Sequence, residues 1–111
     1  MIEQSLTIII PVYNASNTIL QCLESIRVSL NSNPLPMEVD IVIVNDGSSD
    51  NTAITVDSWA RSNCDYPLRI LEQFQQGPSA ARNTGAAVTK KDWLLFMDAD
   101  VVWNKIPFIT L

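Results

Sequence analysis

The stretch Leu6-Thr7-Ile8-Ile9-Ile10-Pro11-Val12 is a nearly continuous run of apolar and β-branched residues. Such a run predicts a β-strand that is covered on both faces, because a strand with one wet face alternates apolar and polar residues. The run Val39-Asp40-Ile41-Val42-Ile43-Val44 has the same character and predicts a second buried strand. Strands of this kind are typical of parallel sheets, so the two runs favour an α/β fold.

The segment between these strands has the pattern of an amphipathic helix. We expect this helix over 15–30, with Ser16 as its N-cap. Its apolar residues recur at helical spacing: Ile19, Leu23, Ile26 and Leu30.

The rest of the chain repeats this alternation of strand and helix. Helices are expected over 52–61 and 78–89, and strands over 68–71 and 93–97. Gly85 lies inside the last helix and costs about 1 kcal/mol relative to alanine there, so we expect a close approach of the backbone at this position. Alternating units of this length predict a doubly wound, mainly parallel sheet in three layers, α/β/α.

Size and composition are typical of one globular domain over residues 1–111. The chain is 47% hydrophobic and 17% charged, and it has no long uncharged apolar stretch. With no secretory signal pattern, we expect a cytoplasmic protein with Cys22 and Cys64 as free thiols. A net charge of −5 and only seven basic residues argue against nucleic acid as a partner.

Polar residues follow three of the expected strands at the point where each ends. Tyr13 and Asn14 follow the first, Asp46 follows the second, and Asp98 and Asp100 follow the fourth. In open parallel sheets, ligands bind beyond the carboxyl ends of the strands. We therefore expect a binding site there, in preference to a sheet without a site.

Asp98 and Asp100 are two positions apart at the end of an apolar strand. Their side chains can then project to the same side and offer carboxylate oxygens to one hard cation, Mn²⁺ or Mg²⁺. Viewed alone, an Asp-x-Asp pair is more often part of a turn. Here, two like charges at an apolar edge are disfavoured unless a cation or hydrogen bonds compensate them.

Each of the other candidates has two interpretations. Asp46 is either a turn or cap residue or an acceptor for a base N–H or a ribose hydroxyl, whereas Asp50 is interpreted as a cap. Tyr13 either packs on the surface or lays its ring against a nucleobase. Arg82 either lies in solvent or pairs with a phosphate, and backbone N–H groups over 77–80 offer a further polar contact.

Four segments, in this order, resemble the N-terminal half of family-2 glycosyltransferases of the GT-A type. They are Pro11-Val12-Tyr13-Asn14, Asn45-Asp46-Gly47-Ser48-Ser49-Asp50, Gly77-Pro78-Ser79-Ala80-Ala81-Arg82-Asn83-x-Gly85 and Phe96-Met97-Asp98-Ala99-Asp100. Together they cover nearly the whole chain, and the combination is far more specific than any one of them.

The resemblance implies a site for a nucleoside diphosphate sugar. Pro11, Tyr13 and Asp46 would border the base and ribose, with Asp46 hydrogen-bonded to the base. Asp98 would face the ribose or sugar, and Asp100 would contact the divalent cation. The implied reaction moves the sugar, with inversion, to a hydroxyl of a glycan or lipid-linked acceptor, and a UDP-sugar is the favoured donor.

The resemblance also implies what the chain lacks. Family members carry the general base and the acceptor-binding region well downstream of the Asp-x-Asp pair, and this sequence stops eleven residues after Asp100. We therefore expect donor and metal binding with little or no transfer.

Two competing interpretations stay open. A haloacid-dehalogenase-like phosphatase also has Asp-x-Asp after an apolar strand, but there the motif opens the domain. The alternative from another class is a non-catalytic or truncated binding module. Its uncovered surface would lie near the end of the chain and would permit self-association; the apolar residues there are Trp103, Ile106, Phe108 and Ile109. A dinucleotide-dependent dehydrogenase fits poorly, because no Gly-x-Gly-x-x-Gly follows a strand.

Overall fold

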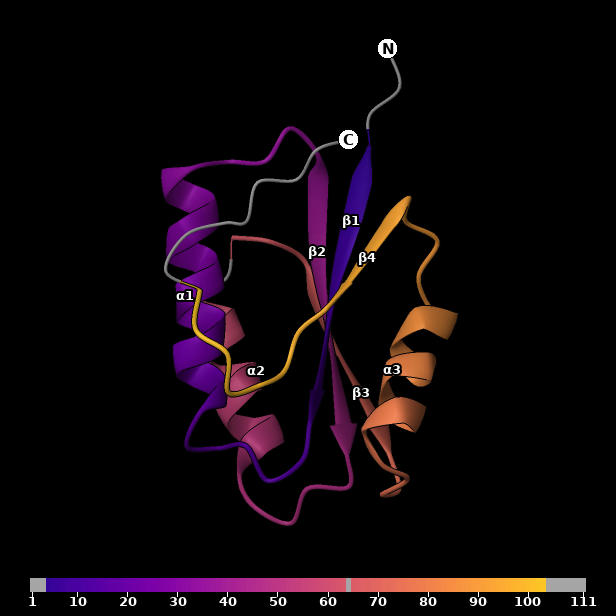
Figure 1. The fold of residues 1–111 in the computed structure, drawn as a ribbon. Coiled ribbons are helices and arrows are strands. Elements are labelled where there is room, and N and C mark those ends of the chain that lie inside the picture. The colour runs from indigo at the N-terminus through magenta and orange to yellow at the C-terminus, as the bar shows by residue number, and fades with distance from the viewer. Residues whose placement is uncertain (1–3, 64, 104–111) are drawn as a thin grey trace.

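The computed structural model describes residues 4–63 and 65–103 of the chain (Figure 1). Cys64, Ile106, Phe108 and Ile109 lie outside the described residues, so the expectations for them stay untested. Strands and helices alternate along the chain as β1 (Ser5–Val12), α1 (Ile19–Ser32), β2 (Glu38–Asp46), α2 (Thr52–Asn63), β3 (Leu68–Gln73), α3 (Pro78–Ala87) and β4 (Trp93–Phe96). Among the described residues, no helix is long and apolar enough to cross a membrane.

The strands form one parallel sheet in the order β3-β2-β1-β4. Ile9 of β1 stands opposite Val42 of β2 on one side and Phe96 of β4 on the other. Helices α1 and α2 cover one face of the sheet, and α3 covers the other (Figure 1). The predicted three-layer, doubly wound α/β architecture is therefore confirmed.

The core lies on both faces of the two central strands, as their unbroken apolar runs predict. Residues of β1 and β2 that point toward α1 and α2 form the larger cluster, in which Ile8, Leu23 and Ile26 are fully buried. Residues on the opposite face, including Ile9 and Val44, form a smaller cluster under α3. A strand buried on both faces has no room for polar alternation, which explains the sequence pattern of β1 and β2.

Gly85 marks the place where α3 comes closest to the sheet. A Cβ atom at this position would lie 2.6 Å from Cγ2 of Ile9 and 3.2 Å from Cγ2 of Val44. Ala81, one turn earlier on the same face of α3, is fully buried. The expected close backbone approach is confirmed, and it explains why the helix carries a glycine despite its propensity cost.

The start of α1 differs from the prediction. The helix begins at Ile19, and Thr18 occupies the N-cap, but its hydroxyl donates to the carbonyl of Ala15 and not to the helix. Ser16 is not the cap. Instead, the backbone N–H of Ser16 donates to Oδ2 of Asp50 at 3.2 Å. Residues before Ile19 are held by the neighbouring βα loop, so the helix begins at Ile19, the first residue of its apolar pattern, and not at Ala15.

The other elements follow the predicted order with small shifts at their ends. Val56 is buried on the inner face of α2, as expected. The other large residue buried there is Trp59, whereas Ala53 and Ala60, which the helical spacing also suggests, are only partly buried. Cys22 is a buried free thiol, as predicted.

Strand β4 is more exposed than its apolar sequence suggests. Trp93, Leu94 and Phe96 are 44%, 39% and 45% exposed. Among the described strands β4 pairs only with β1, and α3 packs over β1 and β2. Trp103, by contrast, packs against the core, and its backbone N–H donates to Oγ of Ser25 at 2.9 Å. Of the four residues expected to be exposed near the end of the chain, Trp103 is therefore packed, and the other three lie outside the described residues.

Candidate functional site

The sheet has a switch point between β1 and β4. From β1 the chain winds through β2 to β3 with α1 and α2 on one face, and it then returns through α3 to place β4 on the other side of β1 (Figure 1). Connections that diverge from neighbouring strands leave a crevice at the carboxyl ends of those strands, which is where ligands bind in such sheets. The residues that follow β1 and β4 therefore flank the expected site.

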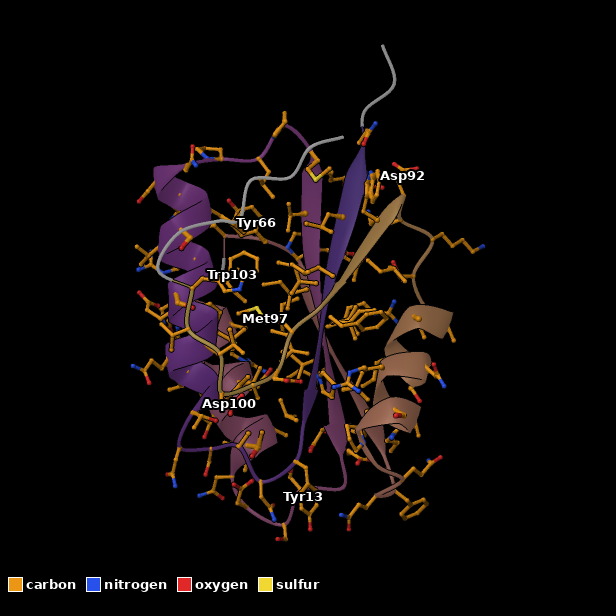
Figure 2. The ribbon with its side chains drawn as sticks, in the orientation of Figure 1. Tyr13, Tyr66, Asp92, Met97, Asp100 and Trp103 are labelled. Carbon is orange, nitrogen blue, oxygen red and sulfur yellow. The ribbon has the colours of Figure 1, made fainter. Side chains whose placement is uncertain are left out.

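Three of the predicted site residues share one pocket at this end of the sheet. Pro11, Tyr13 and Asp46 line a hollow of about 160 Å³ together with Val12 and Pro78. The ring of Tyr13 is 47% exposed and is available to a ligand. In Figure 2, Tyr13 and Asp100 both lie in the lower half of the molecule, whereas Asp92 lies at the opposite end.

A larger hollow of about 600 Å³ lies over α1 and α2, where Leu20, Ile54 and Trp59 contribute to its lining. The described side chains that line it are all uncharged. The smaller pocket is therefore the better candidate for a polar ligand, because it lies at the carboxyl ends of β1 and β2 and contains a hydrogen-bond acceptor, Asp46.

Asp46 is the most tightly held of the predicted residues. Its side chain is only 3% exposed, yet the carboxylate accepts hydrogen bonds from Gln73 Nε2 (2.8 Å), Gln76 N (2.8 Å) and Gly77 N (2.9 Å). Burial by itself raises the pKa of this carboxyl, but the three hydrogen bonds together bring the pKa below its usual value. Asp46 is thus an ionised acceptor that also anchors the loop between β3 and α3.

This anchoring changes the expectation for the start of α3. Because the N–H of Gly77 already donates to Asp46, it is not free to contact a ligand in this structure. Gly47, directly after Asp46, has φ +74°, and a Cβ atom there would lie 2.8 Å from the backbone N of Gln75. The β2–α2 and β3–α3 loops therefore touch through their backbones.

Asn14 joins the loop after β1 to the loop after β2. It has a left-handed backbone with φ +48°. Its Oδ1 accepts the backbone N–H groups of Ser49 at 2.8 Å and Asp50 at 3.3 Å, and its own N–H donates to Ser48 Oγ at 2.9 Å. These bonds determine where Tyr13 stands, because Tyr13 directly precedes Asn14.

Asp50 bonds the start of α2 from the position before Asn51, whose carbonyl accepts the first helical N–H, from Thr55. Its carboxylate accepts from the side chain and backbone N–H of Thr52 and from the N–H of Ser16, and these bonds, the Thr52 hydroxyl first, lower its pKa to about 2. A carboxyl whose pKa is lower in the folded state stabilises that state at pH values above its unfolded pKa. The contribution is lost as the pH falls through the folded pKa.

We expect Asp50→Asn to lower the melting temperature at pH 7, because an amide nitrogen at one of the two oxygen positions cannot accept the same bonds. The difference between wild type and variant should close as the pH falls from about 4 to about 2, where the wild-type carboxylate becomes protonated. Thermal unfolding of both proteins across this range measures it. A difference that stays constant over the range would contradict the role of the charge.

The Asp-x-Asp pair lies in a turn, not on an extended strand end. Strand β4 ends at Phe96, and the N–H of Val101 donates to the carbonyl of Asp98 at 3.1 Å. The side chain of Asp98 accepts from Arg82 at 3.2 Å, so Arg82 is paired rather than free in solvent. Because of this turn, strand alternation does not decide whether the two carboxylates face one cation, and the shared cation stays a prediction.

Asp100 has a different neighbourhood. Its carboxylate is exposed and makes no hydrogen bond or ion pair with other described residues. It lies near Cys22 of α1, where burial first and the Asp100 charge second raise the pKa of the thiol to about 12. The Cys22 Sγ also lies 3.8 Å from the carbonyl of Asp98, so α1 contacts the backbone of this turn.

These residues fit a cation only if the ligand completes its coordination. Within residues 4–63 and 65–103, no group of three or more acidic, cysteine or histidine side chains is placed to hold a metal. Mg²⁺ and similar ions bind through one or two carboxylates together with substrate phosphates. The carboxylate of Asp100, which makes no bond to another described residue, suits that arrangement, whereas one oxygen of Asp98 is already paired with Arg82.

Sequence reasoning missed two residues that support the pocket. Gln73 of β3 donates to Asp46, and Thr84 of α3 lies 2.6 Å from the carbonyl oxygen of the Gln73 side chain. Gln73 is two positions after Leu71, which packs under α3, so its position on the same face was readable from strand alternation. The bond between Gln73 and Thr84 could not be predicted from the sequence, because it depends on how α3 packs on the sheet.

Comparison with known proteins places the chain in a family. The family model described as glycosyl transferase family 2 matches residues 7–108. The chain is 35% identical over 100 residues to the glycosyltransferase GlyA of Streptococcus pneumoniae, covering 90% of this chain and 13% of that protein. It is 36% identical over 96 residues to the uncharacterized glycosyltransferase YibD of Escherichia coli, covering 86% and 26%.

Solved structures agree. S. aureus TarS 1–349 superposes with a TM-score of 0.77 at 26% identity, covering 92% of this chain and 29% of that one. The mannosyltransferase PcManGT from Pyrobaculum calidifontis, in complex with GDP-Man and Mn²⁺, superposes with a TM-score of 0.76 at 27% identity, covering 93% and 29%. The chain thus spans less than a third of each of these proteins. With a family model that spans nearly all of its residues, this chain belongs to glycosyl transferase family 2.

Proposed function

We propose that this chain is the donor-binding half of a glycosyltransferase that moves a sugar from a nucleoside diphosphate sugar to an acceptor hydroxyl with inversion. One observation carries the proposal. The pocket that contains Pro11, Tyr13 and Asp46 lies at the carboxyl ends of β1 and β2, at the same end of the sheet as the turn after β4 that carries Asp98 and Asp100. Family membership supports the class of reaction.

In this proposal the nucleobase enters the small pocket. The exposed ring of Tyr13 offers a face for stacking, Pro11 forms an apolar wall, and the Asp46 carboxylate accepts an N–H of the base. TarS has been solved with UDP-GlcNAc, and PcManGT with GDP-Man. Uracil and guanine both present a ring N–H beside a carbonyl, which suits an acceptor such as Asp46. A UDP-sugar is our favoured donor.

The turn after β4 serves the phosphates and the sugar. Asp100 would hold the divalent cation, Mn²⁺ or Mg²⁺, and Asp98 would face the ribose or sugar. When bound, the cation offsets the charge that develops on the leaving diphosphate. Arg82 pairs with Asp98 in this structure, so a ligand that draws Asp98 away would free a guanidinium near the phosphates.

In this proposal, no described residue binds the acceptor or acts as the general base. Direct displacement with inversion needs a general base for the acceptor hydroxyl, and we place this base, a carboxylate in our proposal, in sequence beyond residue 111. We expect the chain by itself to bind the donor and to transfer little. The phosphatase interpretation is set aside, because the chain belongs to another family and Asp98 follows the last described strand, β4, instead of the first.

The test is calorimetric titration of UDP with and without Mn²⁺. We expect Mn²⁺ to strengthen UDP binding to the wild type, and Asp100→Ala to weaken the Mn²⁺-dependent binding at least about tenfold. Asp57→Ala is the matched control, since it removes an exposed carboxylate on α2 that pairs with Arg61. Mn²⁺-dependent binding that survives in Asp100→Ala would disprove the metal role, and the absence of binding to the wild type would disprove the donor site.

A further inference from the structure

Three side chains from separate elements form a chain of hydrogen bonds behind the nucleobase pocket. Thr84 Oγ1 of α3 lies 2.6 Å from Gln73 Oε1 at the end of β3, and Gln73 Nε2 lies 2.8 Å from Asp46 Oδ1 at the end of β2. Gln73 and Thr84 are both partly buried. Neither lines the pocket itself, so both act on it through Asp46.

The chemistry of these groups fixes the direction of each bond. An ionised carboxylate only accepts hydrogen bonds, so the group that Gln73 turns toward Asp46 must be its NH₂. The amide oxygen of Gln73 then faces Thr84, whose hydroxyl must donate to it. Thr84 Oγ1 also lies 3.0 Å from the carbonyl of Ala80, but its single proton serves one acceptor at a time.

The backbone N–H groups of Gln76 and Gly77 complete the set of donors around Asp46. Together, these donors hold the carboxylate in one orientation and keep it ionised. A carboxylate has about four acceptor positions, and three of them are used, so one remains for a ligand. The pocket therefore presents a fixed group that accepts and never donates.

We infer that Gln73 and Thr84 are positioning residues that set the base preference of this site, because they hold Asp46 as an acceptor for a base that carries a ring N–H. The inference rests on the proposed function. Uracil and guanine meet the requirement. Cytosine and adenine present an unprotonated ring nitrogen at the corresponding edge. This nitrogen and the Asp46 carboxylate are both acceptors, so no proton would lie between them. A site with a buried polar group rejects such a mismatched ligand strongly.

Thr84→Val tests this, since valine keeps the shape of threonine and removes the hydroxyl. With the Gln73 amide free to turn, we expect UDP affinity in the presence of Mn²⁺ to fall about tenfold, and the ratio of UDP to CDP affinity to shrink. Thr84→Ser keeps the hydroxyl and should restore both the affinity and the ratio. Thermal unfolding of each variant checks that it is folded. If Thr84→Val does not fold, Gln73→Leu provides the same test, because it removes the bond from Gln73 to Asp46.

Two outcomes would overturn the inference. One is a folded Thr84→Val protein with the wild-type affinity for UDP and the wild-type UDP to CDP ratio. The other is an equal loss in Thr84→Ser and Thr84→Val, which would show that packing and not the hydroxyl matters. A failure of the proposed function looks different, because the wild type itself would then bind neither UDP nor CDP, and the inference would fall with it.

Discussion

Asn14→Ala is expected to lower the free energy of unfolding by about 3 kcal/mol. Alanine tolerates the left-handed backbone at φ +48° less well than asparagine and costs about 1 kcal/mol or more there. The substitution also removes the acceptor for the N–H groups of Ser49 and Asp50, each worth about 1 kcal/mol. Urea unfolding followed by circular dichroism measures the change.

Two further variants separate these causes. Asn14→Gly relieves the backbone conformation but still lacks the acceptor, so its loss should be about 2 kcal/mol. Asn14→Asp keeps an acceptor oxygen and a residue that tolerates this conformation, so it should be close to the wild type. An Asn14→Asp protein as unstable as Asn14→Ala would show that the bonds to the β2–α2 loop do not carry the effect.

Gly85→Ala is expected to destabilise the protein by about 2 kcal/mol, although alanine is the better helix former. The added Cβ would lie 2.6 Å from Cγ2 of Ile9, which is fully buried and cannot swing away. Forcing an extra carbon into a packed core costs about 1–3 kcal/mol, and we expect the upper end of that range here. The gain of about 1 kcal/mol in helix propensity offsets part of it.

A double-mutant cycle with Ile9→Ala provides the control. Ile9→Ala is destabilising by itself because it leaves a cavity, but it removes the Cγ2 atom that the Cβ added at position 85 would strike. In that background we expect Gly85→Ala to be neutral or stabilising, so that the sign of its effect reverses. A single Gly85→Ala variant, with Ile9 unchanged, that is more stable than the wild type would contradict the close contact.

Both positions support the site from a distance. Asn14 holds the loop that carries Tyr13 against the loop that follows β2, and Gly85 lets α3 lie close to the sheet. Thr84 and Arg82 come from the same helix and reach Gln73 and Asp98. A helix that is pushed outward by an added carbon would therefore loosen contacts on both sides of the proposed donor site.

Much of the fold follows from local patterns in the sequence. The apolar runs of β1 and β2 indicate strands buried on both faces, and the helical spacing between them indicates the crossovers of a parallel sheet. The Gly85 approach was also predicted, because a glycine inside a helix is costly unless packing requires it. Errors fall at element ends, as with Ser16, where contacts from another loop decide where the helix begins.

The site was predicted in part. Strand ends were enough to place Tyr13 and Asp46 together, the family resemblance added Pro11, and the structure brings these three residues into one pocket. The roles of Asp98 and Asp100 toward a sugar and a metal stay predictions. Their alignment toward one cation also stays a prediction, since the backbone turns over 98–101 and one oxygen of Asp98 pairs with Arg82.

The sequence by itself determined the strand and helix order, the parallel three-layer architecture and the family, because each of these depends on periodicity or on short motifs. Only the tertiary structure decided that Asp46 is enclosed by donors from Gln73, Gln76 and Gly77, and that Asn14 joins two loops. These contacts link segments about 30 residues apart, and hydrogen bonds form only when both ends arrive within about 3 Å. That placement is set by the packing of helices on the sheet, which no local pattern encodes.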